Sequence, residues 1–260
     1  MAALAGILAA VPQEAAAGAW TQPRGEGVAI VSTGRQAAPI SSLATGFGDT
    51  DKSFVKAYVE YGLRDRITVG GAIFGELDTT DLVSGSAAVS AFVRTRVWSH
   101  EDGHVASVQL GGSYPVESFL SDTFGASKPD STPEIRASLL TGTGWWGDWG
   151  NAFVSSATGI VWRSEGTANE VRSEFTAGYE PWQCCLALFA VYGTQPIGES
   201  VDSGTATIAP SLVYRIWPEP SRNAIKPREV RTLSLQIGLS HDIMGGSDGL
   251  GLTFAVWKEF

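Results

Sequence analysis

Histidine and cysteine are scarce in this chain, and their scarcity limits the chemistry that it can perform. Three histidines and two cysteines occur among 260 residues, and the two cysteines, Cys184 and Cys185, are adjacent. Neighbouring strand residues point to opposite faces, so we expect this pair to be inert, a poor disulfide and a poor metal site. Because no cluster of His and Cys ligands can be drawn, the sequence predicts no bound metal and no cofactor.

Long apolar runs are missing beyond the N-terminus. The run Met1–Val11, followed by Pro12 and small residues up to Ala17, is typical of a secretory signal that is cleaved after Ala17. It lacks the basic start of such signals, and a buried helix is the alternative. No later segment approaches the ~18 apolar residues of a membrane helix, so only strands could carry the chain through a membrane. We therefore expect a signal-like segment, 1–17, and a single domain, 18–260.

Charged residues are few, at 17%, whereas glycine contributes 31 residues and aromatics 10%. This balance is typical neither of a disordered chain nor of an ordinary soluble surface. From residue 25 onward, segments with a period of two are separated by Gly, Asp, Pro and Ser clusters, which predicts strands joined as hairpins. Most are long enough to cross a bilayer when tilted, and their even number returns both ends to one side. The twelve expected strands cover 25–34, 53–61, 66–76, 84–98, 103–114, 133–143, 151–163, 168–180, 184–194, 204–217, 229–241 and 249–260.

The two faces of these segments differ in chemistry. In 229–241, Leu233, Leu235 and Ile237 alternate with Ser234 and Gln236. Mid-strand charges keep to the polar face, as a lipid-facing exterior requires, because a midplane Lys or Arg there costs ~2–4 kcal/mol. The sequence thus predicts an all-β fold, a closed antiparallel up-and-down transmembrane barrel of about twelve strands. The charges expected to line its lumen are Lys56, Glu60, Arg94, Arg96, Glu134, Arg136, Glu170, Arg172, Glu174 and Arg215.

A soluble sandwich or a lipocalin-like barrel would also alternate, with its apolar face inward. The small residues and opposite charges of the polar face favour the membrane, and so does the distribution of tryptophan, which is typical of an interfacial girdle. Most tryptophans fall at the side of the layout that holds both ends of the barrel domain, and only Trp162 falls near the opposite side. The larger group comprises Trp20, Trp98, Trp145, Trp146, Trp149, Trp182, Trp217 and Trp257.

One expected strand contains a proline. Pro210 interrupts 204–217 in a barrel that has no free edge to excuse a missing N–H group. We expect a bulge at this residue, because a broken strand would lower the strand number.

The last strand ends the chain on an aromatic residue. Phe254, Val256 and Phe260 share one face, and this strand resembles the closing strand of bacterial outer-membrane β-barrels, in which it acts as the assembly signal. Lys258 departs from that pattern but can snorkel into headgroups. Residues 59–70, in which Tyr-Gly-Leu is followed by Thr-Val-Gly, resemble a hairpin of proteobacterial members, and 18–27 is similar to the mature start of an uncharacterised, porin-like group. The resemblance implies an outer-membrane location, recognition by the barrel-assembly machinery and no catalytic residues.

The outer connections of this layout are acidic, with twelve acids and three bases. This balance argues against nucleic acid as a partner and favours divalent cations, which also bridge lipopolysaccharide, or a cation bias in a channel; solvated surface loops are the alternative. The acids are Asp49, Asp51, Asp78, Asp81, Glu117, Asp122, Asp130, Glu165, Glu199, Asp202, Asp242 and Asp248, and the bases are Arg35, Lys52 and Lys128.

Opposite charges inside a twelve-stranded barrel favour a narrow passive channel for small polar or ionic solutes. A sealed structural or surface-interaction barrel, filled by ion pairs, is the alternative. An outer-membrane protease or lipase is less favoured, because His241 and Asp242 point apart, unlike the rim His and Asp of omptin proteases. No histidine lies two residues before a serine, as in the outer-membrane phospholipase. We expect no catalytic residues.

Overall fold

The structure, a computed structural model, describes residues 10–11, 16–37, 52–78, 85–116, 132–147, 149–164, 168–182, 184–198, 204–216, 232–244 and 250–260. All regular structure in these ranges is β-strand. Over the same ranges, no helix is long and apolar enough to cross a membrane.

Twelve long strands follow two short ones, and each long strand overlaps one that the alternation predicts. The short strands are β1 (Ala10–Val11) and β2 (Ala16–Ala17). The long strands are β3 (Gly27–Ala37), β4 (Lys52–Arg64), β5 (Ile67–Asp78), β6 (Gly85–Ser99), β7 (Val105–Pro115), β8 (Glu134–Gly147), β9 (Gly150–Arg163), β10 (Glu170–Trp182), β11 (Cys185–Pro196), β12 (Thr205–Arg215), β13 (Leu233–Met244) and β14 (Leu250–Glu259).

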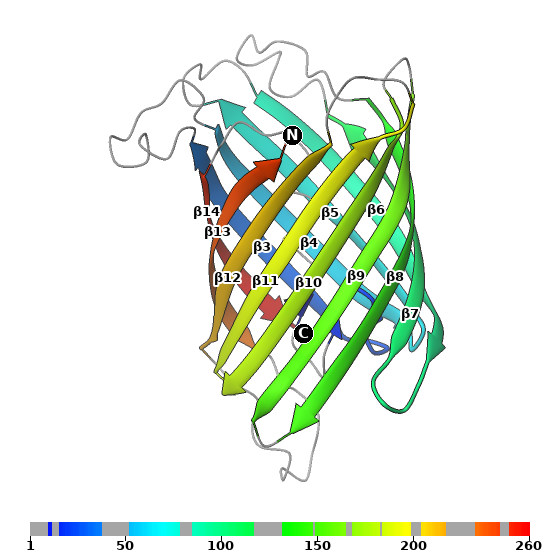
Figure 1. Cartoon of the computed structure of the whole chain (residues 1–260), viewed down its shortest axis with the longest axis vertical. Helices are drawn as coiled ribbons and strands as arrows, with labels where there is room; N and C mark the ends of the chain where they lie inside the picture. The colour runs from blue at the N-terminus through cyan, green and yellow to red at the C-terminus, as the bar shows by residue number, and fades with distance from the viewer. Residues whose placement is uncertain are drawn as a thin grey trace.

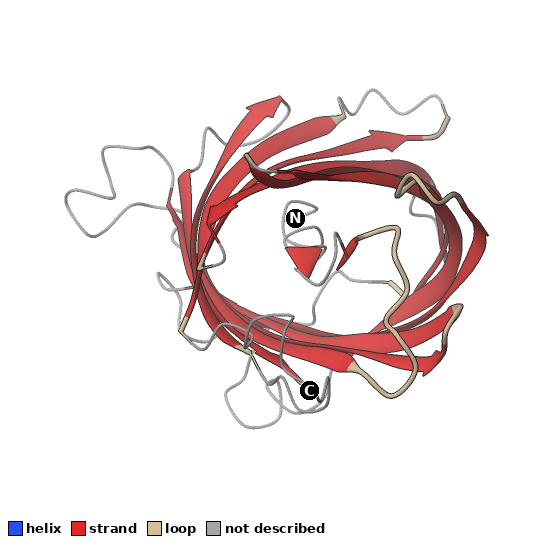
Figure 2. Ribbon diagram, turned by 90° about the horizontal axis from the view of Figure 1, so that it is seen from below, coloured by secondary structure: helices blue, strands red, loops and turns tan. Residues whose placement is uncertain are grey.

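The twelve long strands close into one antiparallel barrel (Figure 1). Each pairs with its neighbours in the sequence, and the last strand, β14, pairs with the first, β3, for example Val256 with Val31. At the end of this seam, Gly27 N donates to Phe260 O at 2.9 Å and Phe260 N donates to Gly27 O at 3.0 Å. Seen along its length, the barrel has a flattened cross-section (Figure 2). The predicted fold class is confirmed, with twelve strands.

The faces of the barrel wall have the polarity of a membrane protein. Large apolar side chains point outward and are exposed, such as Ile73 at 61% and Leu110 at 61%. The inner side carries buried polar residues such as Thr68, Ser107 and Ser234. A soluble sandwich or lipocalin-like barrel needs the reverse arrangement, so those two alternatives are wrong.

One part of the outer surface carries polar side chains among the apolar ones. Exposed hydroxyls on β8, β9 and β10 pair with one another, Thr141 with Ser156 at 2.9 Å and Thr158 with Ser173 at 3.3 Å. Each hydroxyl group therefore has a partner where surrounding lipid would offer none.

Pro210 is accommodated without a bulge at its own position. On one side it lies opposite Phe189 of β11. On the other side, β12 and β13 keep one register from Ile208 to Ser211, but neither of the two residues between them is paired. The register shifts nearby, between Ala206 and Thr207. The expected bulge at Pro210 is wrong, because a local gap in pairing on the β13 side spares the missing N–H group.

A segment that precedes the wall lies inside it. The pair of short strands β1 and β2 stands within the ring of strands (Figure 2). Residues 18–26 follow and lead to the start of β3, and Ala19, Thr21 and Gln22 among them are buried. We name residues 18–25 the N-terminal segment. The expected cleavage after Ala17 stays a prediction, and it would leave this segment at the start of the mature chain.

Candidate functional site, the barrel lumen

All ten charges that the sequence assigns to the lumen lie on the inner side of the wall. Lys56, Glu60, Arg94 and Glu170 are buried, with 4% to 8% of each residue exposed. The other six are partly exposed, namely Arg96, Glu134, Arg136, Arg172, Glu174 and Arg215. Their placement follows from the alternation of each strand. A role for them in permeation stays a prediction.

Glutamates and arginines of β8, β9 and β10 form a charged wall. Glu134 Oε1 accepts from Arg163 Nε at 2.8 Å and from Arg172 Nη2 at 2.9 Å. Glu170 completes the set, because it pairs with Arg163 Nη2 at 3.0 Å and with the Arg172 guanidinium. The sequence pattern missed Arg163, although its spacing from Val161 puts it on the inner face at the end of β9. Interlocked pairs of this kind hold long side chains against the wall.

Arg136 lies beside this network without being locked into it. Its Nε donates to Ser138 Oγ at 2.9 Å, and it forms no ion pair with another residue in the described ranges. A guanidinium whose remaining donors are uncommitted can bind a passing anion.

Glu174 and Lys56 face each other from opposite walls. Their strands, β10 and β4, are six places apart in the closed ring of twelve. Each of these two charges acts on the other, and Arg136 also acts on Glu174. Glu174 Oε1 is buried, with no hydrogen-bond partner in the part of the chain that the structure describes. Charges of both signs therefore lie on opposite sides of the lumen.

A buried ion pair fastens the N-terminal segment to the wall. Arg94 Nη2 donates to Glu60 Oε1 at 2.9 Å, and both side chains are nearly inaccessible, at 8% and 5%. The same guanidinium donates through Nη1 to Trp20 O at 3.1 Å. The other oxygen of Glu60 accepts from Gln22 Nε2 at 3.2 Å. This pair therefore serves as an anchor, and little of its charge faces the passage.

Further hydrogen bonds hold the N-terminal segment at several strands. Gln22 N donates to Thr68 Oγ1 of β5 at 2.7 Å, and Thr21 Oγ1 donates to Asp65 O at 3.1 Å. Ser107 Oγ of β7 donates to Ala19 O, whose residue is fully buried. Contacts with four strands, β4 to β7, and with one turn fix the segment across one end of the lumen, where it narrows the passage.

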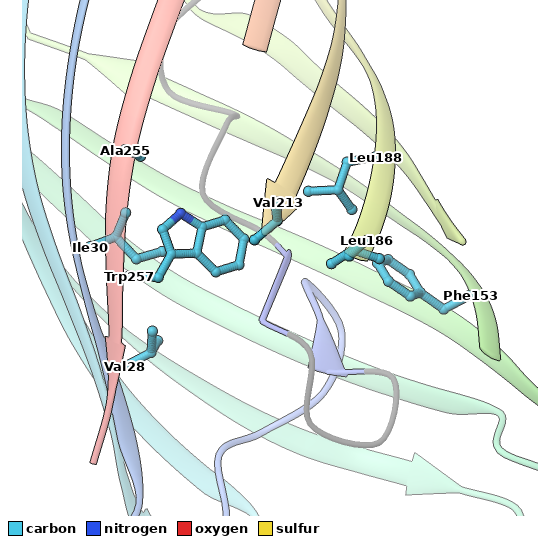
Figure 3. Packing of buried hydrophobic residues seen from close by; sticks show 8 residues of the cluster. All are labelled: Val28, Ile30, Phe153, Leu186, Leu188, Val213, Ala255 and Trp257. Atoms are coloured by element: carbon cyan, nitrogen blue, oxygen red, sulfur yellow. The ribbon is translucent and has the colours of Figure 1, made fainter. Parts of the chain in front are cut away.

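An apolar cluster lines the inner side opposite these anchors (Figure 3). Trp257 of β14 is its largest member, only 1% exposed, and its Nε1 donates to Gln236 Oε1 at 3.0 Å. Trp20 packs against the cluster, edge-to-face with Phe153 at 6.4 Å. The members are Val28, Ile30, Phe153, Leu186, Leu188, Val213, Ala255 and Trp257.

The alternation of the strands predicted a polar lumen, and this apolar cluster was not predicted. One signal was present, because the run from Cys185 to Val191 is apolar on both faces. A strand that is apolar on both faces buries both, and here the inner face packs against other inward side chains.

Two tryptophans lie elsewhere than expected. Trp20 and Trp257 pack inside the lumen, so they are not part of an interfacial girdle. Trp98, Trp145 and Trp182 are exposed at strand ends, as a girdle requires. Trp217 lies outside the described residues.

Several charges assigned to outer loops belong to strands. Arg35, Lys52, Asp78 and Asp242 lie in β3, β4, β5 and β13. Lys52 pairs with Glu76 at 2.8 Å, and Asp242 accepts from Thr207 at 2.6 Å. The remaining loop charges fall outside the described residues, so the acidic rim stays a prediction.

Two of the predicted lumen charges sit at the strand ends. Arg96 donates to Asp65 O at 2.8 Å, in the turn between β4 and β5. Arg215 pairs with Glu180 of β10. Both lie near the end of the barrel that holds the C-terminal residue Phe260, away from the pair formed by Lys56 and Glu174.

The chain resembles known proteins in its fold but not in its sequence. No family model matches the sequence, and no curated protein matches it. Among solved structures, an outer membrane channel from Pseudomonas putida F1 is similar with a TM-score of 0.57 and 10% identity, over 93% of this chain and 98% of that chain. The KdgM porin has a TM-score of 0.51 and 7% identity, over 88% of this chain and 97% of that chain.

A third similar structure is the translocator domain of the autotransporter NalP from Neisseria meningitidis. Its TM-score is 0.50 at 8% identity, over 92% of this chain and 89% of that chain. At such identities the likeness concerns the fold alone. The closed twelve-stranded wall, the apolar outer belt and these likenesses agree, and the chain has the fold of the bacterial outer-membrane β-barrels.

Proposed function

We propose that the protein is a narrow passive channel for small polar or ionic solutes in the bacterial outer membrane. The observation that carries this proposal is the set of charges inside a closed barrel, above all the pair Lys56 and Glu174 on opposite walls. Charged and hydrogen-bonding groups along a lumen keep water in it, and water-filled barrels conduct ions.

The two lumen ends differ in what they offer a solute. The charged wall of β8–β10 presents guanidinium and carboxylate groups, and Arg136 forms no ion pair with any residue that the structure describes. The N-terminal segment and the apolar cluster crowd the other end. A solute would therefore be selected by charge at the wall and by size at the segment.

A sealed barrel is the second candidate function. The fastening of the N-terminal segment by Arg94 and Gln22 favours it, because a fixed segment fills part of the lumen. The barrel would then serve as a structural or surface-interaction protein.

An enzyme has less support. His241 and Asp242 are neighbours on β13, and Asp242 accepts from Gln36 and Thr207 on the inner side. Alternation turns His241 to the other face, so the two side chains do not form one site.

The partners that we propose are those that an outer-membrane barrel meets during assembly and in the membrane. Phe254, Val256 and Phe260 are exposed on the outer face of β14, at 48%, 45% and 45%. This row is available to the barrel-assembly machinery before insertion and to outer-membrane lipid afterwards. Lipopolysaccharide, bridged by divalent cations, is the expected partner of the acidic outer loops, and nucleic acid is not expected.

Ion selectivity tests the channel. Purified protein in a planar bilayer should give small current steps, and Glu174→Gln should lower the preference for cations over anions. Arg136→Gln should raise that preference. A unit charge at about 4 Å in water contributes ~1 kcal/mol, which is roughly a fivefold change in ion occupancy.

Glu101→Gln is the matched control, because Glu101 is exposed in the turn between β6 and β7, away from the lumen. It removes one negative charge and should leave selectivity unchanged. If the wild type and the variants pass no current, and a chain without the N-terminal segment passes none either, the sealed barrel is correct and the channel is rejected.

A further inference from the structure

Two thiols are in contact at the turn that joins β10 to β11. Cys184 lies in the turn and Cys185 is the first residue of β11, and their Sγ atoms are 3.3 Å apart. Both residues are free cysteines and partly exposed. The expectation that these side chains point apart is wrong, because strand alternation begins only at Cys185. The turn brings the sulfur atoms together on one side.

We propose that Cys184 and Cys185 form a redox site, in which the two neighbouring thiols close to a vicinal disulfide. The sulfur atoms need to approach to ~2.05 Å, a short movement from the separation observed. No group of three or more His, Cys, Asp or Glu side chains in the described ranges could hold a metal ion. Oxidation of the pair is therefore the chemistry that the turn supports best.

The reaction is a thiol–disulfide exchange with a dithiol oxidase of the periplasm. One cysteine thiolate attacks the oxidant's disulfide and forms a mixed disulfide, releasing one oxidant thiolate. The second cysteine then attacks the mixed disulfide, so the Cys184–Cys185 bond forms and the oxidant leaves as a dithiol. Two electrons pass to the oxidant, and the two thiol protons pass to its sulfur atoms.

The turn lies where such an oxidant is present. Chain direction puts the C-terminal end of β10 at the same end of the barrel as Phe260 (Figure 1). The short turns lie at this end, which makes it the periplasmic end of an outer-membrane barrel. The bacterial periplasm is kept oxidising. Access to the oxidant therefore rests on the proposed location, whereas closure of the ring can be tested on the purified protein alone.

A vicinal bond is strained and therefore reversible. Adjacent Cα atoms are ~3.8 Å apart, below the ~4.4–6.8 Å of ordinary disulfides. Strained disulfides are more easily reduced, which is the property of regulatory bonds.

The ring that the disulfide closes would change the hydrogen bonding at the end of β12. The peptide group between the two cysteines becomes part of the ring, and its oxygen, Cys184 O, accepts from Arg215 N at 2.9 Å. The side chain of Arg215 pairs with Glu180 of β10. Twisting this peptide would weaken the Arg215 hydrogen bond at the periplasmic mouth of the lumen.

Thiol counting and intact mass test the proposal on the full-length protein in detergent. After equilibration with glutathione disulfide, the wild type should form no disulfide between chains, lose both alkylatable thiols and lose about 2 Da, the mass of two hydrogens. Dithiothreitol should restore both thiols. Amide hydrogen exchange at Arg215 should be faster in the oxidised form.

Single and double serine variants are the controls. Cys184→Ser and Cys185→Ser should each retain one glutathione, since no second thiol remains to displace it. The double variant should show no redox-dependent exchange at Arg215. Two glutathiones per wild-type chain, or two free thiols under conditions that modify the single variants, would overturn the proposal. Neither result bears on conductance, so the channel and the redox site can fail separately.

Discussion

Inward-pointing charges differ in role, since some hold parts of the structure together and others are proposed to act on permeating ions. Arg94 belongs to the first kind. The alternation of its strand predicts that it points inward, and it does. Its partners were not predictable, because Glu60 and Trp20 are distant in the sequence and meet it only when the barrel closes. Lys56 and Glu174 could not be paired from the sequence either. A two-residue period predicts the face on which a side chain lies, but not which residue lies across the lumen from it.

Loss of the Arg94 guanidinium should be costly. Arg94→Ala leaves Glu60 buried without its ion pair, which costs about 3–5 kcal/mol, and frees Trp20 O. We expect a lower denaturant midpoint for unfolding and larger current steps. Arg96→Ala is the control, because Arg96 donates to one exposed backbone oxygen and its loss should cost no more than ~1 kcal/mol. Equal effects of the two variants would refute the anchoring role of Arg94.

At several places in the barrel, an aromatic ring of one strand lies over a glycine of the neighbouring strand. In three places an inward phenylalanine covers the glycine directly opposite on the next strand, where a side chain would collide with the ring; the pairs are Phe54 with Gly34, Phe92 with Gly70, and Phe153 with Gly178. Such pairs help to fix strand register. The strands themselves were predictable from alternation, whereas these pairs depend on register, which the sequence does not state.

Gly178→Ala should disturb the apolar cluster. A Cβ atom there would lie 2.2 Å from the Phe153 ring, which cannot move without leaving Trp20 and the cluster. Overpacking of this kind costs ~1–3 kcal/mol. Gly75→Ala is the matched control, because nothing lies within 4 Å of its added Cβ. The free energy of unfolding, measured for both variants, should fall only for Gly178→Ala.

At the scale of the whole molecule, the barrel contains part of its own chain. The resemblance of 18–27 predicted that it forms the mature start of the chain, but nothing in its residues indicated that it turns back into the lumen. The reason is physical, because its hydrogen-bond partners lie on the four strands β4 to β7 and in the turn after β4. Only the closed ring brings these groups around one segment.

Removal of the N-terminal segment should widen the passage. A chain without residues 18–25 should fold, because the wall pairs only with itself, and it should give larger and less selective current steps. Unboiled and boiled samples on a detergent gel would show whether the barrel has formed. Arg24→Ala, at an exposed position of the same segment, should leave the steps unchanged. Unchanged steps after the deletion would show that the segment does not limit permeation.

The seam between β3 and β14 joins two strands that are far apart in the sequence. The first long strand to be synthesised pairs with the last, and Gly27 finds both of its backbone partners on Phe260, the final residue. Until the last strand arrives, the amide and carbonyl groups at this side of β3 have no partner. The unfinished sheet then has two open edges, which are sites for pairing with other chains. How long those edges are shielded before insertion therefore decides how far pairing with other chains competes with closure of the barrel.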